Sequence, residues 1–416
     1  MNILVLGCGG REHAITAKLN TSKHADKLYV MPGNPGTSTI AINIDKDASN
    51  NLEVLEFCLL NNIDLVIPGS EVYLQNGVAD ILLKHNIHVF GPTKIAAQIE
   101  SSKQFAKDLM KKHAIPTAKY AVFNNYELAL KYVVEVGTPI VIKYDGLAGG
   151  KGVVVAMEFE EAKTALFNML EKKEFGNARV VIEEYLEGPE FSLMCFVDNG
   201  VVIPMPISQD HKRLLDNDLG PNTGGMGIYS PVPIIPLEVI NNTIDNIMQK
   251  TVDALLAEGI NYTGFLYGGI MYTSAGPKVI EFNARFGDPE AEVLMLKLES
   301  DLIEIILNLK AKRKQTIIWN KDFVLGVVLA SKGYPKTYQK GYSITGLESI
   351  KDFYFHMGTS FNDKGFVTNG GRVLFVYGKG KSLLEAKEEA YSNINKIDCS
   401  NLVYRKDIGF RALEKN

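Results

Sequence analysis

Short apolar runs alternate with amphipathic stretches along the first hundred residues of the chain. The pattern predicts β-strands at 3–6, 28–31, 64–68 and 87–90 and helices at 11–20, 51–61 and 76–85. Strands that alternate with helices in this way are typical of βαβ units around a parallel sheet. Each expected strand ends in a turn rich in glycine or proline, and turns at the carboxyl ends of parallel strands commonly line a ligand site.

A different pattern begins near residue 101. Helical periodicity predicts helices at 102–113, 125–136, 160–172, 289–310 and 382–395, and a long helix that ends near 258. Alternating apolar positions predict hairpins at 140–155 and 265–283, strands at 180–184 and 190–206, and a strand-rich tail over 322–416. A polar, glycine-rich segment occupies 208–230. We therefore expect a multi-domain protein of mixed α/β and α+β class.

Composition narrows the class of protein. A chain of 416 residues exceeds one ordinary hydrophobic core, and 46% hydrophobic with 22% charged residues is typical of soluble globular proteins. A net charge of −4 offers no basic surface for nucleic acid, and no apolar run has the length of a signal peptide or membrane span. The four cysteines are far apart and predict neither disulfides nor a zinc site. We expect a cytoplasmic protein that binds neither nucleic acid nor membrane.

The turn after the first strand contains two consecutive glycines, Gly9 and Gly10, followed by Arg11. A dinucleotide-binding GxGxxG motif is excluded because its third glycine position is Glu12. A tight turn into a helix N-terminus favours an anion, so the turn and Arg11 predict a site for one phosphomonoester. The alternative is a purely structural turn, which we consider less favoured because Arg11 has no evident structural role in the sequence.

The segment 145–152 is a glycine-rich loop between two β-branched runs. It is not a Walker A motif, because Asp145 and Gly152 occupy positions that need glycine and serine or threonine, and a strand follows where a P-loop feeds a helix. We interpret it as the tip of a hairpin that folds over a triphosphate, with Lys143 and Lys151 offsetting phosphate charge. The alternative, a surface hairpin with solvated lysines, does not explain a lysine at the end of an apolar strand.

Two further segments carry candidate ligand contacts. Period two in the strand 278–285 places Glu281 and Asn283 on one face, and this pair of oxygen donors suits Mg²⁺. Arg285 follows where a transferring phosphoryl group needs positive charge. The alternative is a solvent-facing polar stripe. The acidic crossing at 183–190 has the backbone and carboxylate groups to bind an adenosine, although such loops are common.

Taken together, these motifs resemble the ATP-grasp superfamily of carboxylate–amine ligases, and specifically the phosphoribosylamine–glycine ligase family. The resemblance spans the whole chain and is carried by segments 9–13, 32–34, 143–152, 209–213, 220–227, 279–290, 368–372 and 405–409. It implies a Rossmann-like parallel-sheet domain at 1–101, an ATP-grasp domain at 102–320 and a small β-rich domain at 321–416. The hairpin would belong to a mobile subdomain at about 118–190.

The resemblance also implies an activity. Glycine would be ligated to 5-phosphoribosylamine through glycyl phosphate, with ATP as co-substrate and Mg²⁺ or Mn²⁺ as metal, in a monomer or weak homo-oligomer. It implies metal ligation by Glu281 and Asn283 and catalytic roles for Lys143, Asp210, Lys212 and Arg285. The implied ATP contacts are Lys103, Lys143, Gly149, Gly150, Lys151, Glu183, Glu184, Leu186 and Glu190. The implied substrate contacts are Gly10, Arg11, Glu71, Asp210, Lys212, Arg213, Pro221, Asn222, Thr223, Gly224, Gly225, Arg285 and Asp288.

Three departures from the family pattern stand out. Ser70 and Tyr73 replace two prolines in the loop after the third expected strand, and Gly149 replaces an alanine, so both loops lose restraint. The segment 267–271 offers no extra acidic ligand for a second metal. Two other functions stay open: a different ATP-grasp ligase of purine metabolism, and a non-catalytic nucleotide sensor. We expect His13 to cap or pack locally, and His211 to be either ligand-facing or structural.

Overall fold

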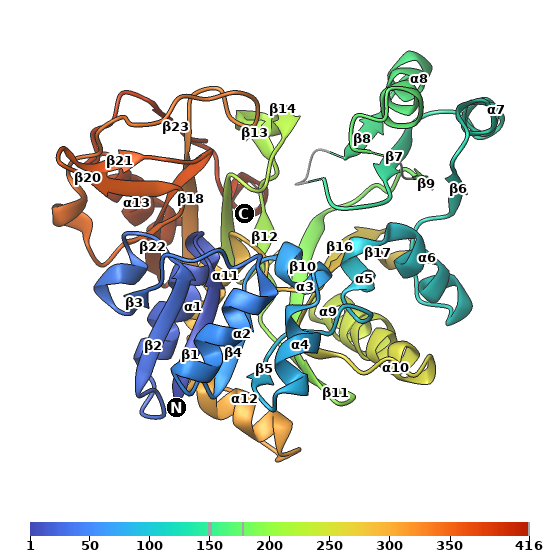
Figure 1. Ribbon diagram of the computed structural model, residues 1–416. Helices are drawn as coiled ribbons and strands as arrows, with labels where there is room; N and C mark the ends of the chain where they lie inside the picture. Colours follow the sequence, from blue (N-terminus) through green and yellow to red (C-terminus); the bar gives the residue numbers. More distant parts are fainter. Residues whose placement is uncertain (149–151, 177–178, 415–416) are drawn as a thin grey trace.

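A computed structural model describes residues 1–148, 152–176 and 179–414. Gly149, Gly150 and Lys151 therefore lie outside the described residues. The described chain forms three regions around separate sheets, with the N-terminal sheet at the lower left in Figure 1 and the small sheet of β6, β7, β8 and β9 at the upper right. The mixed α/β and α+β class predicted from the sequence is confirmed. No helix in these described ranges is long and apolar enough to span a membrane.

The N-terminal region is a parallel sheet, as predicted, and it has five strands in the order β3-β2-β1-β4-β5, of which β3 was not predicted. Ile3 and Val5 face the side covered by α1, whereas Leu4 and Leu6 pack with the helices on the opposite face. Alternation along β1 thus builds both cores. The elements are β1 (Asn2–Gly7), α1 (Gly10–Asn20), β2 (Lys27–Pro32), β3 (Ile42–Asn43), α2 (Asn51–Leu60), β4 (Leu65–Pro68), α3 (Glu71–Gln75), α4 (Val78–Lys84) and β5 (His88–Val89).

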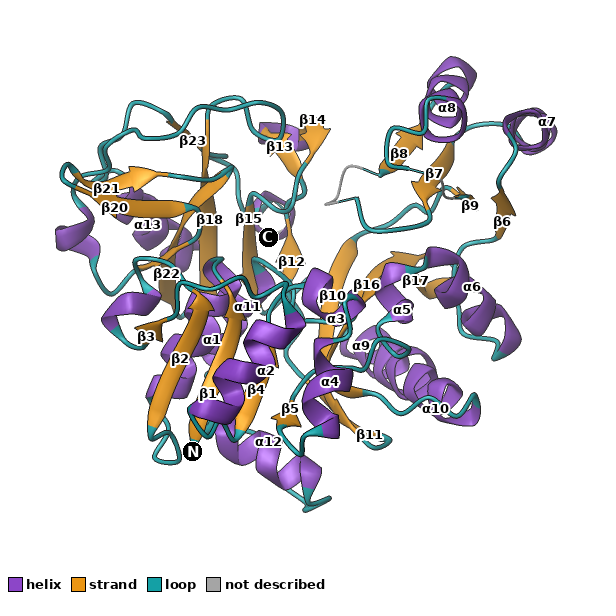
Figure 2. Cartoon of the chain, in the orientation of Figure 1, coloured by secondary structure: helices purple, strands orange, loops and turns teal. Residues whose placement is uncertain are grey.

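The central region contains two four-stranded sheets, distinguished from their helices in Figure 2. The hairpin unit has the sheet β6-β9-β7-β8 and is made of β6 (Tyr120–Phe123), α7 (Tyr126–Val136), β7 (Ile140–Tyr144), β8 (Val153–Ala156), α8 (Phe159–Leu166) and β9 (Val180–Glu184). The larger sheet, β11-β10-β16-β17, consists of β10 (Glu190–Asp198), β11 (Val201–Pro204), β16 (Thr263–Thr273) and β17 (Gly276–Asn283). Around them lie α5 (Gln98–Ser101), α6 (Lys103–Lys112), α9 (Leu237–Thr243) and α10 (Lys250–Ala257). Both predicted hairpins are confirmed.

The C-terminal sheet has the order β12-β15-β18-β22-β19, with β23 also pairing with β18. Its strands are β12 (Gln209–Asp210), β15 (Gly227–Ser230), β18 (Phe323–Ser331), β19 (Tyr354–His356), β22 (Arg372–Gly380) and β23 (Leu402–Val403). Two small hairpins, β13 (Arg213–Leu215) with β14 (Leu219–Asn222) and β20 (Thr359–Asn362) with β21 (Gly365–Thr368), adjoin it, together with α13 (Leu383–Ile394) and α14 (Phe410–Leu413). The sheet thus crosses the boundary predicted at 320, and the three predicted domain ranges remain predictions.

The helix α11 (Glu290–Lys297) connects these regions, and α12 (Leu302–Lys310) follows it. Helix α11 packs against α1 of the N-terminal region and against β15 and β18 of the C-terminal sheet. Sequence periodicity predicted helix throughout 289–310, and the structure interrupts it at 298–301, where Asp301 N-caps α12. The first residue of α11, Glu290, accepts a hydrogen bond from Ser192 Oγ of β10 at 2.9 Å, so the N-terminus of α11 also contacts the central region.

Candidate active site

The strand β17 presents Glu281 and Asn283 beside each other, as the period-two pattern predicted. They pair with Gly269 and Tyr267 of β16, while the intervening Phe282 is buried. The register shifts next to Glu281, because Ile270 pairs with Val279 and Ile280 is left as an extra residue. The carbonyl oxygen of Ile280 accepts a hydrogen bond from Lys143 Nζ at 2.8 Å, which ties β7 of the hairpin unit to this strand.

Three lysines from distant parts of the sequence surround Glu281. Burial acts to raise the pKa of Glu281, but the positive charges of Lys212, Lys143 and Lys103 outweigh it and hold the pKa below its usual value. Glu281 is consequently ionised at neutral pH. Lys103 begins α6 and Lys143 is the last residue but one of β7, so tertiary structure gathers the cations that sequence reasoning assigned separately.

Asn283 and Arg285 share one acidic partner, Glu100. The hydrogen-bond environment places the Asn283 amide nitrogen toward Glu100 Oε1 at 3.1 Å, which turns its oxygen to the other side of the amide. Arg285 lies 3.0 Å from Glu100 and 3.2 Å from Glu71. Burial raises the pKa of Glu100 to about 7, against the opposing effect of Arg285. Sequence reasoning missed Glu100, which belongs to no recognisable motif.

The residues present fit a divalent cation. Glu281 supplies an ionised carboxylate and the Asn283 amide supplies an oxygen directed away from Glu100, and hard oxygen donors of this kind are the ligands Mg²⁺ prefers. Arg285 adds a half-buried positive charge two residues further along the chain. This arrangement can bind a polyphosphate and neutralise charge that develops during its transfer.

Glu183 is a buried junction between two lysines. Its carboxylate lies 3.0 Å from Lys143 and 2.8 Å from Lys107, and its side chain is only 3% exposed. Burial lowers the pKa of Lys107 to about 8. Glu184, the next residue, pairs with Lys278 at 2.8 Å. Glu183 and Glu184 are thus held by lysines through their side chains, and the adenine contact expected of 183–186 would fall to backbone groups.

The base of the glycine-rich loop is fixed to α6. Asp145 Oδ1 accepts hydrogen bonds from Ser102 Oγ at 3.2 Å and from Gln104 N at 3.1 Å. Lys103 Nζ donates to the carbonyl oxygen of Gly146 at 3.1 Å. The loop therefore starts from a defined point next to the Glu281 cluster.

The polar segment 210–225 reaches the Glu281 cluster through Lys212. Lys212 pairs with Glu190 of β10, and Thr223 N donates to the Lys212 carbonyl oxygen at 2.8 Å. Asp210 Oδ1 is buried without a hydrogen-bond partner among the described residues. Gly225 has φ +113°, and a β-carbon there would meet both Asp210 carboxylate oxygens at 2.8 Å. The predicted residues Asp210, Lys212 and Gly225 therefore converge.

The other predicted substrate residues between 213 and 225, and Asp288, are held by contacts with their neighbours. Arg213 donates to Gly220 O at 2.8 Å, and Pro221 and Asn222 belong to the same small hairpin, β13–β14. Gly224 O accepts from Arg372 Nη1 at 2.7 Å, and Asp288 pairs with Arg372 at 3.0 Å. Arg372 links the 220–225 loop to the turn before α11, a role that the sequence did not reveal. The sequence motif at 368–372 was its only signal.

The turn at Gly9–Gly10 is held in place by the first residues of α1. Glu12 accepts from Gly9 N at 2.6 Å and pairs with Arg11 at 2.7 Å, and Arg11 also donates to Phe286 O at 3.1 Å. The argument that Arg11 lacks a structural partner is therefore wrong. The reason is local: Glu12 serves as both the N-terminal cap and the counter-ion, which the spacing alone did not indicate.

Both histidines in question have structural roles. His13 Nδ1 accepts from His356 N at 3.0 Å, which agrees with the packing role expected of it. His211 Nε2 accepts from Gly409 N at 3.2 Å, so its proton resides on Nδ1, which faces Gly227 O at 3.2 Å. His211 is 0% exposed, and both of its ring nitrogens face main-chain groups. These contacts favour the structural alternative of the two that the sequence left open.

Neutral His211 should contribute to stability in a pH-dependent way. Burial, reinforced by Arg411 and Arg405, lowers its pKa to about 3. Both states are uncharged above the unfolded pKa of about 6.5, whereas below it the unfolded chain binds the proton first, so stability falls as pH decreases. Between pH 7.5 and 5 the wild type should lose about 2 kcal/mol more unfolding free energy than His211→Gln, measured in urea. His85→Gln, at an exposed position, is the control; equal losses in H211Q and wild type would contradict this assignment.

The hairpin unit facing the larger sheet, with a carboxylate–amide pair and converging lysines between them, defines an ATP-grasp ligase. Comparison with known proteins makes the family specific. The chain belongs to the phosphoribosylglycinamide synthetase family, also called phosphoribosylamine–glycine ligases, because models of its N, ATP-grasp and C domains match residues 1–100, 101–291 and 324–411. The resemblance stated from the sequence motifs is thereby confirmed.

Individual relatives agree with this family. A phosphoribosylamine–glycine ligase of Halalkalibacterium halodurans is 49% identical, with 99% of this chain and 97% of the relative covered. One from Yersinia pestis is 47% identical over the full length of both chains. The crystal structure of the Thermotoga maritima enzyme superposes with a TM-score of 0.85 at 34% identity, covering 98% of this chain and 100% of that one. A biotin carboxylase from Campylobacter jejuni, 17% identical with a TM-score of 0.74 over 99% and 95% of the chains, shares the fold.

Proposed function

We propose that this protein ligates glycine to 5-phosphoribosylamine at the expense of ATP, giving glycinamide ribonucleotide, ADP and phosphate. The observation that carries the proposal is the convergence of Lys103, Lys143 and Lys212 on Glu281, with Arg285 nearby, in a chain of this family. Its relatives are named as ligases for these substrates. ATP would lie between the hairpin unit and the larger sheet.

The residues present support two chemical steps. The glycine carboxylate attacks the γ-phosphate of ATP, and Lys143, Lys103 and Arg285 offset the charge that spreads over the transferring group. The amine of phosphoribosylamine then displaces phosphate from glycyl phosphate. A neutral amine is already a nucleophile, so the step needs orientation by groups such as Asp210 and Lys212. Glu281 and Asn283 would hold Mg²⁺ or Mn²⁺, which supplies charge neutralisation at the ATP phosphates.

The remaining assignments extend this proposal. Glu190 and the backbone at 184–186 would bind adenosine, and the segment 210–225 with Asp288 and the Gly10–Arg11 turn would bind the amine substrate. Residues 118–190 would move as a lid that excludes water, because acyl phosphates hydrolyse readily. A cytoplasmic location and a monomer or weak homo-oligomer complete the proposal.

The decisive experiment measures ADP formation in the presence of phosphoribosylamine generated from ribose 5-phosphate and ammonia. We expect ADP only when ATP, the amine and glycine are all present. Formation without glycine would indicate another ATP-grasp ligase. Nucleotide binding without ADP formation under any of these conditions would indicate a sensor and would refute the proposal.

A further inference from the structure

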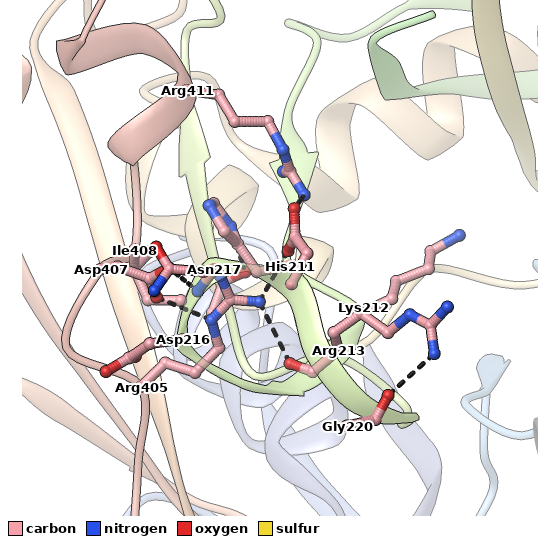
Figure 3. Close-up of polar contacts among 12 residues, drawn as sticks. His211, Lys212, Arg213, Asp216, Asn217, Gly220, Arg405, Asp407, Ile408 and Arg411 are labelled. Carbon is pink, nitrogen blue, oxygen red and sulfur yellow. Dashed lines mark hydrogen bonds and ion pairs between the residues drawn. The ribbon is translucent and has the colours of Figure 1, made fainter. Parts of the chain in front are cut away.

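The C-terminal segment 405–411 folds back onto the loop that carries Lys212 (Figure 3). Arg405 makes the largest number of the contacts described below, and it is only 1% exposed. Its Nε and Nη2 donate to the two carboxylate oxygens of Asp407 at 2.8 and 2.7 Å. Its Nη1 donates to Asp218 Oδ1 at 2.9 Å and to the carbonyl oxygen of Arg213 at 3.1 Å. One guanidinium thus joins the C-terminal segment to both ends of the 213–218 turn.

Two hydrogen bonds from backbone N–H groups to side-chain carboxylates join the same two segments. Asp407 Oδ2 accepts from Asn217 N, and Asp216 Oδ1 accepts from Lys406 N, both at 2.8 Å. Asn217 and Asp218 have φ values of 56° and 54°, a left-handed conformation that side-chain-bearing residues rarely adopt without support. Polar contacts from Asp407 and Arg405 supply that support. The turn therefore depends on a segment almost two hundred residues later in the chain.

The clamped turn leads directly to the proposed site. Arg213, whose carbonyl is held by Arg405, follows Lys212, and His211 on the other side is anchored by Gly409 N. In Figure 3 the Lys212 side chain points away from Arg405. Arg405 therefore holds the backbone next to Lys212, while the Lys212 side chain pairs with Glu190. Asp210 precedes His211. The backbone between Asp210 and Arg213 is thus attached to the C-terminal segment at two points.

We propose that Arg405 is a positioning residue which, through the clamp of Arg405, Asp407 and Asp218, sets the placement of Lys212 and Asp210 for the ligase reaction. The inference rests on the proposed function, because it concerns the same site. Arginine suits the task since its planar fork holds two carboxylates and a carbonyl at once, whereas a lysine ammonium is a single point charge. Arg405 itself contacts no substrate in this role.

The test is Arg405→Met, which keeps length and removes the fork. Hydrogen exchange, followed by mass spectrometry, should accelerate in peptides spanning 211–225, because the bond from Thr223 N to Lys212 O loses its support. At saturating substrates, kcat per nucleotide-binding site should fall about tenfold, since displacement of positioned groups by a fraction of an ångström is costly. Normalising to bound nucleotide separates positioning from loss of folded protein.

Two further variants keep the test decisive. Arg405→Lys retains the charge and should show the same changes to a smaller extent, which provides the readout if R405M does not fold. Arg313→Met, at an exposed position after α12, is the matched control and should change neither quantity. Unchanged exchange at 211–225, or unchanged kcat per bound nucleotide in an active protein, would overturn the inference. An inactive wild type would instead refute the proposed function, while the exchange measurement would still report on the clamp.

Discussion

Glu281→Ala should reduce ligase turnover at least about 100-fold while the protein stays folded. The carboxylate is one of two proposed metal ligands, and metal and charge-stabilising groups contribute several kcal/mol to such reactions. Its removal also leaves Lys212, Lys143 and Lys103 facing one another without their shared counter-ion. The measurement is kcat at saturating ATP, glycine and amine, repeated over a range of Mg²⁺ concentrations. We expect half-maximal activity to require more Mg²⁺ in the variant.

The control for this variant is Glu238→Ala, which removes an exposed carboxylate from the first turn of α9. It should match the wild type in kcat and in Mg²⁺ dependence. The unfolding transition of Glu281→Ala should remain cooperative, which separates a chemical effect from loss of structure. Near-normal turnover in folded Glu281→Ala would remove this residue from the site.

Periodicity predicted those parts of the fold whose elements are long and regular. Periods visible in the sequence predict the parallel sheet and both central hairpins. They also predict that Glu281 and Asn283 share one face of their strand. The segment 208–230 was recognised only as polar and glycine-rich. Its strands β12 and β15 are short, and they exist because β15 pairs with β18, a partner about one hundred residues away. Register with a distant strand is not encoded in local alternation.

The residues of the candidate site also divide into those that the sequence predicted and those that it did not. Lys143 and Arg285 were predicted because their types and positions suggested chemistry, and Lys212 because the resemblance to the ligase family implied it. Glu100 and Lys107 were missed because each is a single charged residue on a helix, and only the folded chain brings them to Arg285 and Glu183. Arg11 is a further example, since the sequence indicated no structural partner for it and the folded chain pairs it with Glu12. The contacts of Glu100, Lys107 and Arg11 thus depend on the folded structure and could not be read from residue type alone.

Lys143→Met should lower turnover about 100-fold and weaken ATP binding. Lys143 lies 3.0 Å from Glu183 and 2.8 Å from Ile280 O, and its charge also acts on Glu281. It thus links the hairpin unit to the proposed metal strand next to Glu281. A phosphate-binding charge of this kind in a water-poor site contributes several kcal/mol. Steady-state kinetics should show a lower kcat and a higher KM for ATP.

Lys107→Met provides a matched comparison, because Lys107 pairs with the other oxygen of the same Glu183 carboxylate at 2.8 Å. It contacts Thr117 Oγ1 at 2.7 Å and has no bond to Ile280 or β17 itself among the described contacts. Removing Lys107 leaves Glu183 paired with Lys143, so we expect lower thermal stability with kcat reduced much less than in Lys143→Met. If both variants lost turnover equally, Glu183 and its two lysines would act only as a structural junction, and Lys143 would have no separate role toward ATP.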